Sequence, residues 1–327
     1  MRQFNRHIFL WLLVCLCLAC TEKLGLELPD DSLLGTEISF DTAVISYDED
    51  PEGGNPDTKL DMKFYNSSYT WENGDKIKIV KYSQKSDSDA ASEYTYSSSS
   101  WSSSSPLRWE STGVHDFYAV YPSTAAVSFD NPDLTYSDKA AVIDVEIPRN
   151  QNNSNLAANY AMAGTYHVDN PEPQMSFNMY PLLTVVRFVF YNRTGTTLRV
   201  SPTQLVGWDE TSWPSNQFYL YGKYQVKTEA SEPSNYWSKS VNSSLVGFSE
   251  TPTSRSLVLN AVSTISDGAG GSWGCQFYVV PNNYKRFVLS VDFTKGSNPK
   301  QSKQITYTAS GNIFDPFKIH YLYLTVY

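Results

Sequence analysis

Short runs of alternating apolar and polar residues, separated by turn-forming residues, recur along the chain from residue 60 onward. The clearest run, Val-Val-Arg-Phe-Val-Phe-Tyr, lies at residues 185–191 inside an expected strand over 182–191. No long segment shows the 3.6-residue period of an amphipathic helix, and many short strands between turn signals are typical of antiparallel β-sandwiches. The pattern therefore predicts an all-β protein.

The same alternation places further strands, and turn residues mark their ends. The pair Asn73-Gly74, between 69–71 and 76–80, predicts a hairpin. A serine tract over 97–105, broken only by Trp101, is expected to be a solvated hairpin loop. The remaining expected strands cover residues 37–47, 93–97, 107–110, 114–121, 140–147, 175–178, 217–224, 257–259, 276–280, 287–293, 304–307 and 319–327.

The first twenty residues have the organisation of an export signal. A basic start with Arg2 and Arg6 precedes an uncharged run over 8–19, which is too short to span a membrane but suits a signal peptide. Leu18-Ala19-Cys20 ends this run and resembles the lipobox of bacterial lipoproteins. We expect cleavage before Cys20 and lipid attachment to its sulfur, which would tether the chain to the outer-membrane lipid of a Gram-negative cell surface. The alternative is an ordinary secretion signal.

Chain length and composition divide the rest of the molecule. After a signal peptide over 1–19, the polar, acidic stretch 20–60 is expected to be a tether with one candidate strand. The remaining length suits two domains, which we place at 61–172 and 173–327. The net charge of −9 does not favour nucleic acid as a partner, because phosphate binding requires a basic surface.

No set of residues with the spacing of a catalytic, metal or cofactor site stands out in the sequence. Once Cys20 carries lipid, Cys275 has no partner for a disulfide and is expected to be a small buried residue. His115, His167 and His320 are far apart and lack metal-ligand spacing. We therefore expect a protein without cofactor or metal that is not an enzyme, with an exported hydrolase as the least favoured alternative.

Four tryptophans in turn-rich stretches offer a second functional hypothesis. If exposed, their flat faces would stack on sugar rings, and if buried, they are ordinary packing aromatics. The alternative function is thus a glycan-binding outer-membrane lipoprotein. The four candidates are Trp208, Trp213, Trp237 and Trp273.

Five phrases, in order, resemble conserved phrases of the fimbrillin-like family of Bacteroidota surface lipoproteins and fimbrial subunits. They lie at 71–79 (WENGDKIKI), 116–122 (DFYAVYP), 159–163 (NYAMA), 176–188 (SFNMYPLLTVVRF) and 276–282 (QFYVVPN). The resemblance implies two tandem transthyretin-like β-sandwich domains. It also implies a non-enzymatic role in cell adhesion, as a fimbrial anchor, tip or stalk subunit or as an adhesin, with other fimbrial subunits and a host or bacterial surface ligand as partners.

The resemblance also implies assembly by β-strand addition, in which proteolysis removes an N-terminal strand and a neighbour's strand fills the groove. The chain has no Arg between Cys20 and Arg108, so Lys59, after Thr58, is the nearest match to the usual cleavage position. The last strand, 319–327, is the candidate donor strand, but the favoured interpretation is a strand that pairs within its own sheet, as terminal strands usually do. One face of it carries Ile319, Tyr321, Tyr323, Thr325 and Tyr327.

Overall fold

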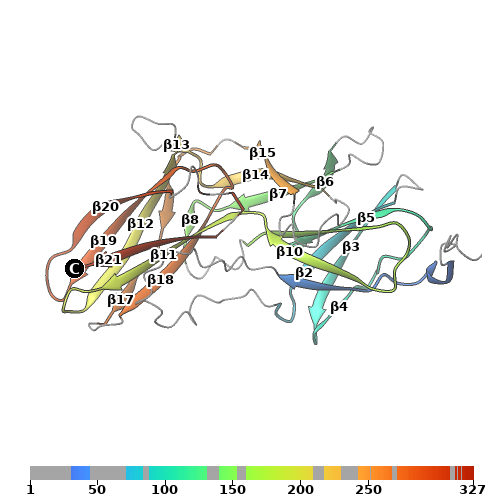
Figure 1. Cartoon of the computed structure of the whole chain (residues 1–327), viewed down its shortest axis with the longest axis horizontal. Coiled ribbons are helices and arrows are strands. Elements are labelled where there is room, and N and C mark those ends of the chain that lie inside the picture. The colour runs from blue at the N-terminus through green and yellow to red at the C-terminus, as the bar shows by residue number, and fades with distance from the viewer. Residues whose placement is uncertain are drawn as a thin grey trace, which may run out of the picture.

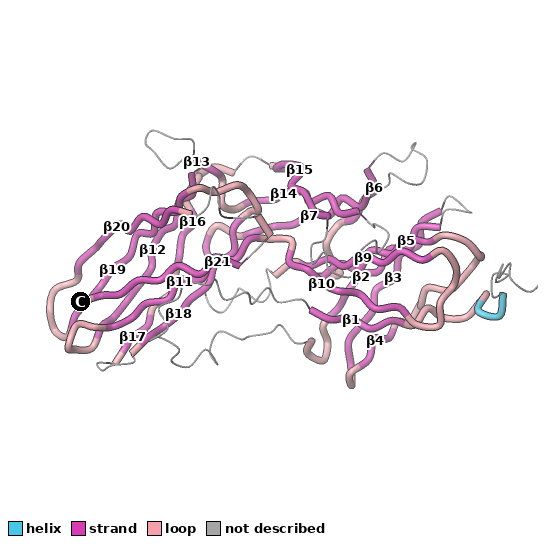
Figure 2. Tube along the Cα trace, viewed as in Figure 1, coloured by secondary structure: helices cyan, strands magenta, loops and turns pink. Residues whose placement is uncertain are grey.

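The structure, a computed structural model, is built almost entirely from strands and loops (Figures 1 and 2). It describes residues 31–44, 71–83, 88–130, 140–152, 160–208, 217–229, 242–250, 252–266, 271–309, 314, 316–317 and 319–327. The one helix in this part of the chain is η1, a 3-10 turn at Asp31–Leu33. None of the described helical structure is long and apolar enough to cross a membrane. The predicted all-β class is confirmed.

The first sheet occupies the end of the molecule that contains β1 to β5 (Figure 2). Its seven strands, in order across the sheet, are β1 (Phe40–Val44), β10 (Met175–Pro181), β9 (Met162–Val168), β5 (His115–Tyr121), β2 (Lys76–Ser83), β3 (Ser88–Ser97) and β4 (Ser100–Ser102). All neighbours are antiparallel except β1 and β10, which run parallel.

Two sheets form the opposite end of the molecule. The three-stranded sheet has the order β18 (Ser272–Val279), β11 (Thr184–Asn192) and β21 (Ile319–Val326). The larger sheet has the order β20 (Gln301–Thr308), β19 (Arg286–Lys295), β12 (Leu198–Trp208), β16 (Leu257–Leu259) and β8 (Asn150–Gln151), with β13 (Gln217–Phe218) and β17 (Ser263–Ile265) also paired to β12. Rings from both sheets meet between them, as the buried Phe188 of β11 and the half-buried Tyr307 of β20 do at 5.8 Å. This packing gives the sandwich arrangement that the sequence predicts.

The fourth sheet lies between these ends, with the order β15 (Asn242–Phe248), β14 (Gly222–Glu229), β7 (Ala140–Ile147) and β6 (Val127–Asp130). It draws strands from both sides of the predicted domain boundary at residue 173, because β14 pairs with β7 along its whole length. The short strand β8 also crosses this boundary, to pair with β16. The division at residue 173 stays a prediction, and the two parts of the chain share sheets.

The core has two parts, which lie on the two faces of the first sheet. On β2, Val80 belongs to the large cluster that extends through the other three sheets. Ile77 and Ile79, on the opposite face of the same strand, belong to a smaller cluster together with Ile38 and Phe40. Alternation along β2 therefore supplies both clusters. The smaller cluster is completed by residues from the start of the chain.

Two turn predictions have different outcomes. Gly74 adopts φ +100° in the predicted Asn73-Gly74 turn, but the strand that follows, β2, pairs with β3 and β5. The serine tract does form a hairpin, in which Ser98 and Ser99 have φ of 51° and 64° between β3 and β4. Two successive positive φ values are the geometry of the tight turn that fits the twist of paired strands.

Candidate functional site

The N-terminal segment, residues 31–44, adds a strand to the edge of the first sheet. Its strand β1 runs parallel to β10, in register from Phe40 opposite Met175 to Val44 opposite Met179. On its other side, β10 is paired with β9 only near its end, at Tyr180 and Pro181. The N-terminal segment is therefore the partner that covers the edge of β10 along residues 175–179.

Aromatic packing holds this strand against the sheet. Phe40 is 7% exposed, and its ring centroid lies 4.8 Å from that of Tyr94 and 5.7 Å from that of Phe177, both edge to face. The ring of Trp101 stacks on Phe40 at 6.4 Å, and its Nε1 donates a hydrogen bond to the Thr42 hydroxyl at 3.0 Å. Burial of a Phe side chain stabilises a protein by about 1.5–3 kcal/mol. Removal of Phe40 would leave an apolar groove between these rings.

Backbone hydrogen bonds tie the same segment to residues 107–110. The Gly35 amide donates to the Trp109 carbonyl at 2.7 Å, and the Ile38 amide donates to the Leu107 carbonyl at 2.9 Å. Arg108 adds an ion pair with Glu37 at 2.9 Å. Both of these charged side chains are about half exposed, so the ion pair contributes little, about 1 kcal/mol at most. The groove therefore has one wall at β10 and a second wall at residues 107–110.

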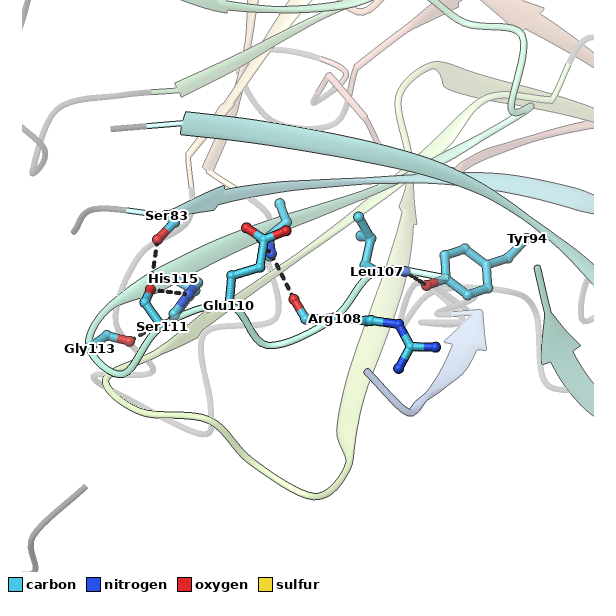
Figure 3. Close-up of polar contacts among 9 residues, drawn as sticks. Ser83, Tyr94, Leu107, Arg108, Glu110, Ser111, Gly113 and His115 are labelled. Carbon is cyan, nitrogen blue, oxygen red and sulfur yellow. Dashed lines mark hydrogen bonds and ion pairs between the residues drawn. The ribbon is translucent and has the colours of Figure 1, made fainter. Parts of the chain in front are cut away.

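Polar contacts from the strands of the first sheet fix the second wall (Figure 3). Lys81, which is 1% exposed, donates a hydrogen bond from Nζ to the Arg108 carbonyl at 2.8 Å and pairs with Glu110 at 3.2 Å. The Leu107 amide donates to the Tyr94 hydroxyl at 2.9 Å. Because the carbonyl and amide of the wall are both satisfied by side chains of the sheet, the wall has a fixed position.

His115 anchors the loop that follows the wall. It is fully buried at the start of β5, and its Nδ1 lies 2.7 Å from the Gly113 carbonyl, so Nδ1 carries the proton. Burial lowers the pKa of His115, and the positive charge of Lys81 lowers it further. The Ser111 hydroxyl lies 3.4 Å from Nε2 and 3.3 Å from the Ser83 hydroxyl. A neutral, buried imidazole whose Nδ1 binds a carbonyl suits structural anchoring.

Lys81 and the Trp101–Thr42 contact were not expected as parts of a site. Lys81 does leave a signal in the sequence, because strand alternation places it on the same face of β2 as Ile77 and Ile79. Lys76 and Lys78 lie on the opposite face. A lysine on the apolar face of a strand requires a polar partner. The Thr42 contact leaves no such signal, since 59 residues separate the two side chains.

The candidate donor strand is found as β21, paired in parallel with β11 over eight residues. Tyr321 accepts a hydrogen bond from Nη1 of Arg187 at 2.8 Å. Tyr323 stacks on Tyr321 and is 41% exposed, and Tyr327 is 80% exposed. Ile319 and Thr325 lie opposite Val185 and Tyr191 of β11. In this structure the strand pairs within its own chain and lies at the edge of the three-stranded sheet.

Of the other residues singled out in the sequence, some lie outside the described part of the chain and the rest are buried or half-buried. Cys20, Lys59, Trp213 and Trp237 lie outside the described residues. Trp208 is 6% exposed, and the guanidinium of Arg286 covers its ring at 4.8 Å, so the open face that sugar stacking needs is not present there. Trp273 is half-buried and stacks on Phe190 at 5.6 Å. Cys275 is buried, and burial raises the pKa of its thiol.

The titratable side chains give little indication of chemistry. In the described ranges, no three or more His, Cys, Asp and Glu side chains are grouped in a way that could hold a metal ion. The Asp116–His167 pair, at 2.7 Å, joins neighbouring strands β5 and β9. The groove that holds the N-terminal segment is therefore the candidate functional site.

Comparisons with known proteins identify the family of the chain and proteins of similar fold. A sequence model of the fimbrillin-like family matches residues 65–325. Among solved structures, a Bacteroides ovatus protein described as a candidate cell adhesion protein has a TM-score of 0.50 at 12% identity, with 88% of this chain and 91% of that chain covered. A Bacteroides uniformis protein of the same description has a TM-score of 0.46 at 12% identity, with 79% and 88% covered. At this identity, the first likeness shows the shared fold alone. No curated protein sequence matches the chain.

Proposed function

Because the chain belongs to the fimbrillin-like family, we propose that it is a surface lipoprotein that serves as a fimbrial subunit or adhesin and joins its neighbours by β-strand addition. A fimbrial or adhesin role at the cell surface follows from the family. The lipid anchor at Cys20, the outer-membrane location, the absence of catalysis and the mode of assembly are the parts that we add.

The observation that carries the proposal is the position of β1. It is the one described strand of the first sheet that precedes Lys59, and it occupies an edge position, where removal leaves the other strand pairs intact. A cut after Lys59 would separate it from the rest of the chain. The unpaired edge of β10 and the space left by Phe40 would then offer backbone and apolar contacts to a new strand.

A strand from a second copy is the natural occupant of that groove. The candidate donor is β21, which ends one residue before the end of the sequence and carries an apolar side chain or tyrosine at most positions. To act as a donor it must first leave β11, with which it is paired from Val185 to Asn192. If no cut occurs at Lys59, the lipid at Cys20 stays, and the protein acts as an anchor subunit or as a stand-alone adhesin.

Two variants and a mass measurement test the proposal in native cells. Cys20→Ala is expected to lose membrane fractionation, and its full retention in the membrane would remove the lipid anchor from the proposal. Lys59→Gln is expected to abolish processing and, with it, the polymers that strand addition would form, which are detected on gels. Lys63→Gln is the matched control, because it removes the same charge four residues further on. N-terminal mass analysis separates an acylated end at Cys20, indicating an anchor or adhesin, from an end near Leu60, indicating a stalk subunit.

A further inference from the structure

A cavity of about 460 Å³ lies where the loop after β5 meets β7 and β14, and none of its lining residues belongs to the groove of the N-terminal segment. Pro122, Ala125 and Ala126 of that loop, together with Ala161 before β9, supply an apolar wall. Cavities of about 300–1,000 Å³ that combine an apolar wall with a few polar groups are typical of small-molecule sites.

Charged side chains on two paired strands line the other side of the cavity. Asp144 and Glu146 are two residues apart on β7, so they project from the same face, and both are exposed. Lys223 of β14 is in register with Glu146, and its ammonium binds Glu250 at 3.2 Å. Gln225 donates from Nε2 to Asp144 at 2.9 Å. The Asp144 carboxylate is thus held in place by a cross-strand neighbour, and Glu146 lies beside Lys223 in the register.

These groups retain hydrogen-bonding capacity toward the cavity. An ionised carboxylate has about four acceptor sites, and Gln225 occupies one on Asp144. The Lys223 ammonium has three donors, of which one faces Glu250. Ser249 and Thr124 add hydroxyls to the lining. The cavity can therefore accept hydrogen bonds from a ligand through its carboxylates and donate through its ammonium and hydroxyl groups.

The balance of charges selects among ligand classes. The lining carries the carboxylates of Asp144 and Glu146 and one ammonium, that of Lys223, which already pairs with Glu250, and this balance disfavours an anionic ligand. A wholly apolar ligand would desolvate the polar groups without replacing their hydrogen bonds. A neutral molecule with many hydroxyls and an apolar C–H face satisfies both sides of the cavity.

We propose that this cavity binds a neutral sugar of one or two rings, through hydroxyl groups that donate to Asp144 and Glu146 and accept from Lys223. The C–H face of the ring lies against Pro122 and the alanine wall. This site is separate from the tryptophans considered from the sequence, and it does not depend on strand addition. It gives the surface protein a small-ligand site in addition to its contacts with other subunits.

The test is saturation-transfer NMR on the purified full chain with galactose, mannose, N-acetylglucosamine, lactose and maltose, and with glucuronic acid and putrescine as charged comparators. The variant D144N/E146Q removes both carboxylate charges, and Ala126→Trp fills the cavity without a change of charge. The matched control, E72Q/D89N, removes two exposed carboxylate charges, one from the turn before β2 and one from β3. Thermal unfolding confirms that each variant is folded.

The expected result is saturable binding of at least one neutral sugar, weakened by about tenfold or more in D144N/E146Q and in Ala126→Trp but unchanged in the control. Binding of none of the neutral sugars overturns the proposal, as does binding of putrescine alone. Undiminished sugar binding in D144N/E146Q also overturns it, because the sugar then binds elsewhere. Since both substituted carboxylates are exposed, this variant leaves the fold intact even if Ala126→Trp does not.

Discussion

The ammonium of Lys81 on β2 donates a hydrogen bond to the backbone carbonyl of Arg108 at 2.8 Å. Arg108 lies in the wall at residues 107–110 against which the N-terminal segment packs. Arg108 in turn donates from Nη1 to the Gly35 carbonyl at 2.8 Å and pairs with Glu37. A buried lysine of the sheet is thus connected, through one residue, to the N-terminal segment. The groove wall keeps its position because the sheet itself anchors it.

Lys81→Met is expected to destabilise the protein by about 1–3 kcal/mol, because the Arg108 carbonyl loses a charged donor in a buried place. Methionine keeps most of the apolar stem, so the change isolates the ammonium. Chemical denaturation measures the effect. Lys76→Met on the same strand is the control, and since its ion pair with Glu93 is half exposed, a change within about 1 kcal/mol is expected. Equal effects of the two substitutions would contradict a positioning role for Lys81.

Phe40→Ala is expected to loosen the N-terminal segment more than the rest of the protein. Truncation of a buried Phe costs about 3–5 kcal/mol, but here local detachment of an edge strand limits the loss in global stability. Hydrogen exchange of the Ile38 and Met175 amides, which bind the Leu107 and Ser39 carbonyls, should accelerate by about a hundredfold. Ser39→Ala, at the exposed neighbour, should leave both rates unchanged. Acceleration spread evenly over β2 and β5 would argue against local release.

The strands that the sequence predicts well are those with an uninterrupted pattern. The apolar run expected at 182–191 appears as β11 at Thr184–Asn192, because a strand buried on both faces needs apolar residues at nearly every position. The eleven-residue strand β12 was not expected, since Pro202 lies in its middle. The register between β12 and β19 shifts between Pro202 and Gln204, and this irregularity accommodates the proline inside a central strand.

The pairing between strands that are distant in the sequence could not be predicted from one sequence alone. The alternation at 140–147 predicts β7, but nothing in it identifies β14, some eighty residues later, as its partner. The groove shows the same division. An N-terminal strand was expected within 37–47, and β1 lies there, whereas the parallel pairing with β10 and the wall at residues 107–110 are tertiary relationships. Local pattern determines where strands form, and long-range packing determines which edges meet.

Stability should fall as the pH drops below about 6.5, through His115. Its pKa is lowered in the folded protein by burial and then by Lys81, with Glu110 the opposing charge, so the unfolded chain binds a proton more readily. The neutral form therefore contributes fully above about pH 6.5, and this contribution is lost as the pH falls below that value. Between pH 6.5 and 5, wild type should lose up to about 1.4 kcal/mol per pH unit more than His115→Gln. Parallel stability profiles for the two proteins would contradict this assignment.

Tyr321→Phe is expected to weaken the attachment of β21 to β11. The Tyr321 hydroxyl accepts from Arg187, which is 7% exposed and lies over the same ring at 5.5 Å, so loss of the hydroxyl removes a charged hydrogen bond but keeps the ring. The expected cost is about 1–2 kcal/mol by denaturation, with faster hydrogen exchange along β21. Tyr327→Phe, at the 80% exposed last residue, should change neither quantity. If β21 is the strand donated to a neighbour, Tyr321→Phe should also speed polymer formation after cleavage at Lys59, because release from β11 precedes donation. Faster exchange along β21 without faster assembly would show that another strand is donated.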